Sequence, residues 1–192
     1  MNKIPTIFVR DWDGTIGPPA RLVLDLGADG CEWVFAGEGV ATVKYDGTCC
    51  LIRDGRLFKR QEVREGKLLL EGFEVVGYDS ETGKTVGWLP VGDGPEDKWH
   101  REAFTVDPPI PLRDGTYELV GPKVQGNPER FDHHALIDHS EAEQTDAPRD
   151  YDGLRDFFAG EDIEGVVWHH PDGRMAKVKA KDFGLTRGKV TV

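Results

Sequence analysis

The sequence of 192 residues is poor in cysteine and has no long apolar run. Two of its three cysteines, Cys49 and Cys50, are adjacent, which makes a poor framework for disulfide bonds. This cysteine usage fits a reducing compartment, so we expect a cytoplasmic protein. No apolar stretch approaches the roughly 18 residues of a membrane helix, and no basic and apolar leader is visible. The sequence therefore predicts neither membrane insertion nor secretion.

Basic residues are also scarce: 24 Lys and Arg stand against 35 Asp and Glu, which gives a net charge of -11. This charge argues against a general nucleic-acid-binding protein. The basic side chains are nevertheless concentrated, with six in residues 53–67 and six in residues 174–192, whereas residues 138–164 are strongly acidic. If the two basic stretches meet in the fold, we expect a local phosphate site there.

Glycine (24) and proline (12) are frequent, and the apolar runs are short and β-branched. This composition favours a turn-rich α+β fold over a helical one. Without a repeat or a clear linker, the simplest prediction is a single domain spanning residues 1–192. We expect helices at 96–104 and 152–159, and strands at 4–10, 32–43, 49–60 (interrupted at Asp54-Gly55), 73–78, 85–91, 116–120, 134–138, 163–168 and 175–180.

Residues 11–15 contain Asp-x-Asp-Gly-Thr, the nucleophile signature of haloacid-dehalogenase phosphatases. In those enzymes, aspartates that follow an apolar strand hold Mg²⁺ and attack phosphorus. Here Arg10 interrupts the apolar run, and the chain lacks the alternating strand and helix pattern of a doubly wound sheet. A phosphatase acting through Asp11 and Asp13 is kept as an alternative, and residues 11–19, with Pro18-Pro19, are interpreted as a turn.

The stretch VKYDGTCC (residues 43–50) places a lysine between two predicted strands. The pattern predicts that Lys44 ends one strand, that Asp46-Gly47 forms a tight bend, and that the chain turns straight back. A lysine beside a carboxylate suits covalent chemistry when burial or a nearby cation lowers the pKa of its amine. The alternative is a hairpin whose lysine points into water, and Lys-x-Asp-Gly alone does not decide between the two.

Two later clusters favour the catalytic interpretation. Glu164 opens the apolar strand EGVVW, and Lys177 and Lys179, two residues apart, share one face of the following strand. Taken singly, these residues suit a solvated strand end and an exposed face. If the strands pair, however, they converge, and together with Lys44 and Asp46 they supply a nucleophile, carboxylates for Mg²⁺ and cations for a triphosphate. Those are the groups needed to transfer a nucleotidyl group onto a lysine.

This ordered set resembles the covalent nucleotidyltransferase superfamily of ATP-dependent ligases and capping enzymes. Six segments resemble, in the same order, the small ATP-dependent 5′–3′ RNA ligase family, known in animals as RNA ligase 1. The segments are KYDGTCC, VGWLPV, KWH, YELVGPKVQGNP, HALIDH and IEGVVWHHPDGRMAKVKAKDFGL. The resemblance runs from Ala41 to Leu185 and leaves out residues 1–40, which we interpret as an N-terminal strand and turn segment.

The resemblance implies an α+β adenylation domain built on antiparallel sheet. Lys44 would attack the α-phosphorus of ATP to form lysyl-AMP. AMP would pass to an RNA 5′-phosphate, and a 3′-hydroxyl would displace it. The implied cofactors are ATP and Mg²⁺ or Mn²⁺, and the partner is RNA with these two ends, with no obligatory protein partner evident. A DNA-nick ligase, a self-adenylating nucleotidyltransferase and a non-catalytic nucleotide-binding module remain alternatives.

The resemblance also assigns roles to individual residues. Glu164 would hold the metal, and Asp46 either assists it or fixes the bend. Lys177 and Lys179 would offset charge at the α-phosphate. The remaining nucleotide and RNA contacts would come from Glu118 (ribose hydroxyls), Arg60 (5′-phosphate), the backbone near Val43 (adenine), and Phe131 or His134 (adenine stacking).

Other conspicuous residues have ordinary explanations. The histidines and cysteines lack Cys-x₂-Cys or His-x₃-His spacing, so they do not indicate zinc. Trp88, Trp99 and Trp168 are expected in the core, and Asn127 is expected to serve a turn. Only 13 residues follow Lys179, so we expect no OB-fold. RNA would then be gripped by residues 174–192, by other local patches or by a partner.

Overall fold

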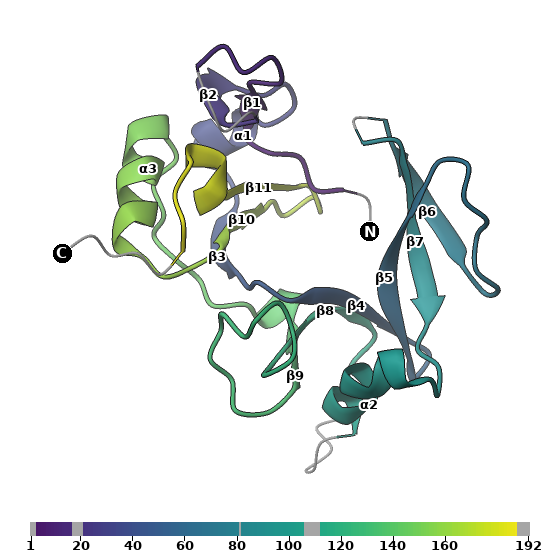
Figure 1. The fold of residues 1–192 in the computed structure, drawn as a ribbon. Helices are drawn as coiled ribbons and strands as arrows, with labels where there is room; N and C mark the ends of the chain where they lie inside the picture. The colour runs from purple at the N-terminus through teal and green to yellow at the C-terminus, as the bar shows by residue number, and fades with distance from the viewer. Residues whose placement is uncertain (1–2, 17–20, 81, 106–111, 188–192) are drawn as a thin grey trace. The chain divides into compact units, whose positions relative to one another are not determined.

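The computed structural model describes residues 3–16, 21–80, 82–105 and 112–187, and it is an α+β fold with antiparallel sheets, as predicted (Figure 1). The chain forms two compact units. Unit 1 comprises Met1–Lys3 and Asp46–Glu141, and unit 2 comprises Ile4–Tyr45 and Ala142–Val192. Such units occur within one domain as well as between domains. The single-domain prediction therefore stays a prediction.

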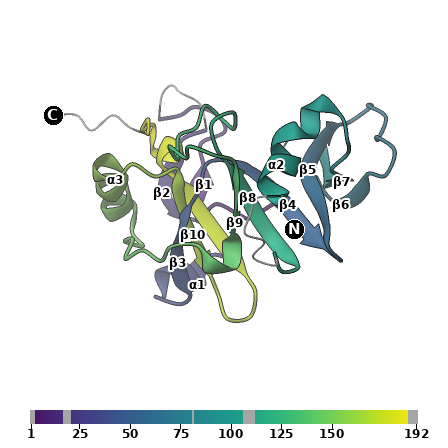
Figure 2. The same ribbon diagram turned by 90° about the horizontal axis from the view of Figure 1, so that it is seen from below.

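Unit 2 contains two antiparallel sheets (Figures 1 and 2). A two-stranded sheet pairs β1 (Phe8–Arg10) with β2 (Val23–Gly27). A three-stranded sheet has the order β11-β10-β3, built from β3 (Val40–Lys44), β10 (Gly165–His169) and β11 (Met175–Lys179). The helices are α1 (Glu32–Phe35), α3 (Tyr151–Gly160) and a 3₁₀ helix at Ala180–Phe183.

The two faces of the three-stranded sheet in unit 2 differ, because side chains alternate along each strand. Five apolar residues on one face are at most 6% exposed: Ala41, Val166, Trp168, Ala176 and Val178. They join a core with residues from other elements of the unit, including Ile7, Phe8, Val34, Leu154 and Phe158. Burying each large apolar side chain contributes about 1.5–3 kcal/mol. The opposite face, called the polar face below, carries Thr42, Lys44, Lys177 and Lys179 together with the apolar Val40, Val167 and Met175.

Unit 1 is a six-stranded antiparallel sheet of order β6-β7-β5-β4-β8-β9. Its strands are β4 (Thr48–Arg53), β5 (Arg56–Arg64), β6 (Glu74–Asp79), β7 (Lys84–Pro90), β8 (Gly115–Val120) and β9 (Ala135–Asp138). Two 3₁₀ helices (Pro95–Asp97 and His139–Glu141) and helix α2 (Lys98–Phe104) complete it. Ala103 of α2 packs in a core with Cys50, Ile52, Leu57, Tyr117, Leu119 and Val124.

Most predicted elements are confirmed within a few residues, including both helices and the β10–β11 hairpin. One local prediction was wrong. Residues 32–35 are helical rather than extended, because the consecutive side chains Trp33 and Val34 are both buried (5% and 0% exposed), which a helical turn allows. Helix α3 begins at Tyr151, one residue before the predicted start, and its N-cap is Asp150, whose side chain accepts from the Gly153 N–H.

The predicted hairpin at Lys44 was also wrong. Strand β3 pairs with β10, whereas β4 pairs with β5 and β8, so the chain changes sheet between Lys44 and Thr48 instead of turning back. Alternating hydrophobicity predicts strands but says nothing about their partners.

None of the helices in the described ranges has both the length and the apolar character needed to cross a membrane.

Candidate functional site

The polar face of the three-stranded sheet in unit 2 brings the predicted lysines together. The strand register pairs Lys44 with Gly165, and Gly165 with Lys179, so these residues form one row across the sheet. Lys177 lies two residues before Lys179 and therefore projects from the same face. Gly165, in the middle of the row, has no side chain, and a Cβ there would lie 2.3 Å from the Val178 carbonyl oxygen. Only glycine fits at this position.

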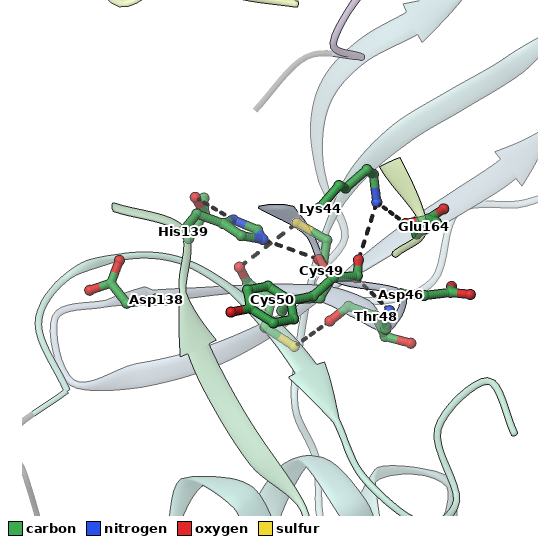
Figure 3. A network of polar contacts seen from close by, with 12 residues as sticks. Lys44, Asp46, Thr48, Cys49, Cys50, Asp138, His139 and Glu164 are labelled. Atoms are coloured by element: carbon green, nitrogen blue, oxygen red, sulfur yellow. Dashed lines mark hydrogen bonds and ion pairs between the residues drawn. The ribbon is translucent and has the colours of Figure 1, made fainter. Parts of the chain in front are cut away.

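Glu164 precedes β10 and bridges two of these lysines. Its Oε2 accepts a hydrogen bond from Lys44 Nζ at 2.5 Å, and its Oε1 accepts one from Lys179 Nζ. The Glu164 side chain is 12% exposed and that of Lys44 is 19% exposed. Figure 3 shows Lys44 directed at Glu164. We call Lys44, Glu164, Lys177 and Lys179 the lysine cluster.

The lysine cluster concentrates positive charge in a poorly hydrated place. Burial, followed by the ammonium groups of Lys179 and Lys44, lowers the pKa of Lys177 from 10.5 to about 8. Burial and the Lys44 ammonium also lower the pKa of Lys179. Burial alone would raise the pKa of Glu164, but Lys44 and Lys179 outweigh it, so its pKa is lowered. One ionised carboxylate thus faces three cationic groups, an arrangement suited to a polyanionic ligand.

The predicted convergence of Glu164, Lys177 and Lys179 on paired strands is therefore confirmed, and Lys44 lies with them. The alternative of a lysine that merely points into water does not fit the partly buried ion pair between Lys44 and Glu164. The catalytic roles of these residues stay predictions. The other candidate residues, Asp46, Arg60 and Glu118, belong to unit 1.

In unit 1, two glutamates hold the Asp46-Gly47 segment. The Asp46 N–H donates to Glu129 Oε1 at 2.7 Å, and the Gly47 N–H donates to Glu118 Oε1 at 3.1 Å. A Cβ on Gly47 would lie 2.1 Å from the Leu119 carbonyl oxygen. Glycine is therefore required at position 47 because β8 approaches closely. The tight turn that the Asp-Gly pair predicted is not the reason.

Glu118 has a second partner, His139, which the sequence did not predict. His139 Nε2 lies 3.1 Å from Glu118 Oε2, and His139 Nδ1 lies 3.1 Å from Thr116 Oγ1 (Figure 3). His139 stands in the HALIDH segment, and only that segment could have drawn attention to it. Each carboxylate oxygen has two lone pairs, so Glu118 can still accept from the hydroxyls of a ribose.

Arg60 and Glu118 project from the same face of the six-stranded sheet. Cys50 pairs with both Lys59 and Tyr117, so those three side chains share the face that α2 covers. Arg60 and Glu118 follow Lys59 and Tyr117 by one residue each and therefore point to the opposite face. The structure thus groups the predicted phosphate-binding and ribose-binding residues on one surface of unit 1.

The proposed adenine-stacking residues are less suitable. His134 is 3% exposed, stacks on Trp99 with a centroid distance of 4.6 Å, and has its Nδ1 2.8 Å from Glu102 Oε1. Phe131 is half-buried. Asn127, with φ of 58°, hydrogen-bonds the Phe131 backbone through its side chain at 2.9 and 3.1 Å, which is the turn chemistry expected of it. His134 therefore belongs to the packing of unit 1.

Tryptophan burial largely follows the prediction. Trp88 and Trp168 are 4% and 0% exposed, and Trp99 is partly buried in its stack with His134. Val43 lies on β3 opposite Val166.

Asp11 anchors a turn. Its carboxylate accepts hydrogen bonds from the Thr15 and Ile16 N–H groups and from Thr15 Oγ1, each at 2.9 Å. Asp11 is 3% exposed, and its pKa is lowered, chiefly by the Ile16 N–H. The turn interpretation of residues 11–16 is thus confirmed, while Pro18-Pro19 lies outside the described residues. The strands named above pair antiparallel, which differs from the doubly wound sheet of the phosphatase alternative.

Resident metal sites are not apparent in the described part of the chain, where no three His, Cys, Asp or Glu side chains gather as potential ligands. Glu164 belongs to unit 2 and Asp46 to unit 1, so a metal held by both carboxylates stays a prediction. The basic stretches 53–67 and 174–187 likewise belong to different units.

Comparison with known proteins gives consistent matches. A family model described as RNA ligase 1 matches residues 96–191. RNA ligase 1 of Pongo abelii is 28% identical over 137 residues, which cover 55% of this chain and 42% of the relative. RNA ligase 1 of Rattus norvegicus is 26% identical over 137 residues with the same coverage. The chain therefore spans less than half the length of these relatives, and the family match includes Glu118, Glu164, Lys177 and Lys179 but begins after Lys44.

Proposed function

Because this chain belongs to the RNA ligase 1 family, we propose that it joins RNA ends at the expense of ATP, through a lysyl-AMP intermediate on Lys44. The observation that carries this proposal is the lysine cluster. A partly buried lysine at a strand end is held by Glu164, and two further lysines project from the same face. The α+β fold with antiparallel sheets agrees with the adenylation domain that we propose for it.

In the proposed first step, Lys44 Nζ forms a bond to the α-phosphorus of ATP and pyrophosphate leaves. The amine must lose its proton and its contact with Glu164 before it attacks. Lys177 and Lys179, fixed on the neighbouring strand, would offset the negative charge that develops at the α-phosphate. Their lowered pKa values indicate that these ammonium groups are poorly hydrated, so their charges act on a bound phosphate with little screening.

A Mg²⁺ or Mn²⁺ ion fits the lysine cluster as part of the metal–ATP substrate. Glu164 is the single carboxylate among three ammonium groups, so phosphate oxygens and water would supply the other ligands. When bound there, the ion would polarise the α-phosphate. Engaging Glu164 in this way would also release Lys44 from its resting ion pair.

For the later steps we propose that unit 1 supplies further contacts. Glu118, already oriented by Gly47 and His139, would accept hydrogen bonds from the ribose hydroxyls of the adenylate. Arg60, on the same face of the sheet, would bind the RNA 5′-phosphate, where a guanidinium can make two hydrogen bonds. AMP would pass to that phosphate, and the RNA 3′-hydroxyl would then displace AMP to close the strand.

The proposal is tested by incubating the protein with ATP labelled at the α-phosphate and with Mg²⁺ or Mn²⁺. We expect an acid-labile AMP adduct that is absent from Lys44→Ala and present in the surface variant Lys181→Ala. Absence of an adduct with either metal would refute the ligase proposal. Sealing of 5′-phosphorylated single-stranded RNA in preference to nicked DNA would support RNA as the substrate, whereas equal sealing of both would contradict it.

A further inference from the structure

The N-terminal segment lies outside the region of resemblance and outside the residues that the family model matches, yet it contacts β11 directly. The Lys177 N–H donates to the Pro5 carbonyl oxygen at 2.9 Å, and the Ile7 N–H donates to the Lys177 carbonyl oxygen at 3.0 Å. Thr6 and Lys177 form an isolated parallel β-bridge. Residues 5–7 therefore cover the edge of the three-stranded sheet at the position of Lys177.

Lys179 is held at the same edge by a different group. Main-chain groups, like side chains, alternate along a strand, so Lys177 and Lys179 direct their N–H groups to the same edge. The Lys179 N–H donates to Asp182 Oδ2 at 2.9 Å. Asp182 is 2% exposed and belongs to the 3₁₀ helix that follows β11. Its carboxylate thus fixes the last residue of the strand.

Arg10 connects these two attachments. Its guanidinium donates to the second oxygen of Asp182 (Oδ1, 2.9 Å), to Thr6 Oγ1 (3.1 Å) and to the Arg21 carbonyl oxygen (3.0 Å). The Arg10 side chain is 23% exposed, so its pairing with the buried carboxylate is partly shielded from water. Asp182 therefore links Arg10 to the main chain of Lys179, and a displacement of Arg10 would shift Lys179 through this one carboxylate.

We propose that Pro5–Arg10 form a strap that positions Lys177 and Lys179 for nucleotidyl transfer, with Arg10 and Asp182 as its positioning residues. The strap contacts Lys177 through main-chain hydrogen bonds and is linked to Lys179 through Asp182, while the Lys179 ammonium group donates to Glu164. The inference rests on the proposed function, since it assigns the strap to the same reaction. It gives a role to Arg10, which the sequence offered only as an interruption of an apolar strand.

The expected effect follows from geometry. Truncating Arg10 leaves the buried Asp182 carboxylate without its cation, and Asp182 can then turn away from the Lys179 amide. Misplacement of a phosphate-contacting group by about 1 Å costs up to roughly 100-fold in rate. We expect the rate constant for adduct formation at saturating ATP to fall about tenfold or more in Arg10→Ala and Asp182→Ala. Asp182→Asn keeps an oxygen for the Lys179 N–H and should lose less.

Two controls separate positioning from general stability. Leu154→Ala removes a fully buried core side chain from the same unit and lowers the melting temperature, but it removes none of the hydrogen bonds that join the strap to Lys177 and Asp182. Arg155→Ala removes an arginine that pairs with Asp152 on α3. Both should keep the adduct rate constant within about twofold when measured well below their melting temperatures. Amide hydrogen exchange gives a second readout, because Arg10→Ala should accelerate exchange at Lys177 and Lys179.

The outcomes are distinguishable. If wild-type protein forms the adduct and Arg10→Ala matches it, or if the rate falls no more than in a Leu154→Ala variant of equal melting temperature, the strap has no positioning role. Unchanged exchange at both lysine amides would also overturn it. If wild-type protein forms no adduct, the ligase proposal fails first, and the strap loses its assigned reaction with it.

Discussion

Replacing Lys177 by methionine is expected to stabilise the protein at neutral pH. Burial lowers the pKa of Lys177 from 10.5 to about 8, because its ammonium group is dehydrated and lies among other cations. At about 1.36 kcal/mol for each pH unit, that difference corresponds to about 3 kcal/mol of folding free energy. Lys177→Met removes the charge and keeps an unbranched side chain. The free energy of unfolding should therefore rise by up to about 3 kcal/mol.

The pH dependence has a definite sign. Below pH 8 Lys177 is protonated in both states, and the full cost of the buried charge is present. Between pH 8 and 10.5 the folded state loses the proton while the unfolded state keeps it, so wild-type stability recovers as the pH rises. The advantage of Lys177→Met should thus shrink from about 3 kcal/mol at pH 7 to about 1 kcal/mol or less at pH 10.

Urea unfolding at pH 7 and pH 10, compared with wild type, measures both quantities. For a chain of this size, a gain of about 3 kcal/mol also raises the melting temperature by roughly 6–12 °C. Lys181→Met, at an exposed position after β11, is the control and should change stability by less than about 0.5 kcal/mol. If Lys177→Met is no more stable than wild type at pH 7, or if its advantage is independent of pH, the electrostatic description of the lysine cluster is wrong.

Three further predictions follow from single contacts. Glu164→Gln should reduce the rate of AMP adduct formation by about 100-fold or more in the labelled-ATP assay, because the only carboxylate of the lysine cluster is lost; a rate near wild type would contradict its role. Lys59→Met leaves Asp97, which is 2% exposed and lies 2.5 Å from Lys59 Nζ, without its cation. Urea unfolding should show a loss of about 3 kcal/mol, whereas Lys67→Met, at an exposed site, should show almost none. Gly47→Ala places a Cβ 2.1 Å from the Leu119 carbonyl oxygen, so it should lower the melting temperature measurably. An unchanged melting temperature would show that β8 can move away from residue 47 at little cost in stability.

Much of the fold could be predicted from local patterns. Alternating apolar residues predicted most strands, and the Asp54-Gly55 pair predicted the turn between β4 and β5, where both residues have positive φ (51° and 68°). Those features depend on neighbouring residues alone. The helical turn at 32–35 could not be predicted in this way, because two consecutive buried side chains suit either a covered strand or a helix.

In the candidate site, too, local features could be predicted from the sequence, and contacts between distant segments could not. The spacing of Lys177 and Lys179 predicted a shared face, since side-chain alternation is a local property. The pairing of β3 with β10 was not predictable, because no local pattern specifies a partner 120 residues away in the chain, the separation of Lys44 from Glu164. The contribution of His139 to Glu118 was also missed, because a histidine next to a strand end gives no signal of the carboxylate it will meet.

The sequence by itself determined the chemical groups and their order: a lysine before Asp-Gly, a glutamate at a strand start, and two alternating lysines on the next strand. These depend on residue identity and on the period of a strand. The tertiary structure alone decided that Lys44 and Lys179 share one carboxylate, that Gly47 is required by the approach of β8, and that Arg10 reaches Asp182. Each of these depends on segments that meet only when the sheets assemble, because burial of the apolar faces, and not any local preference, fixes which strands become neighbours.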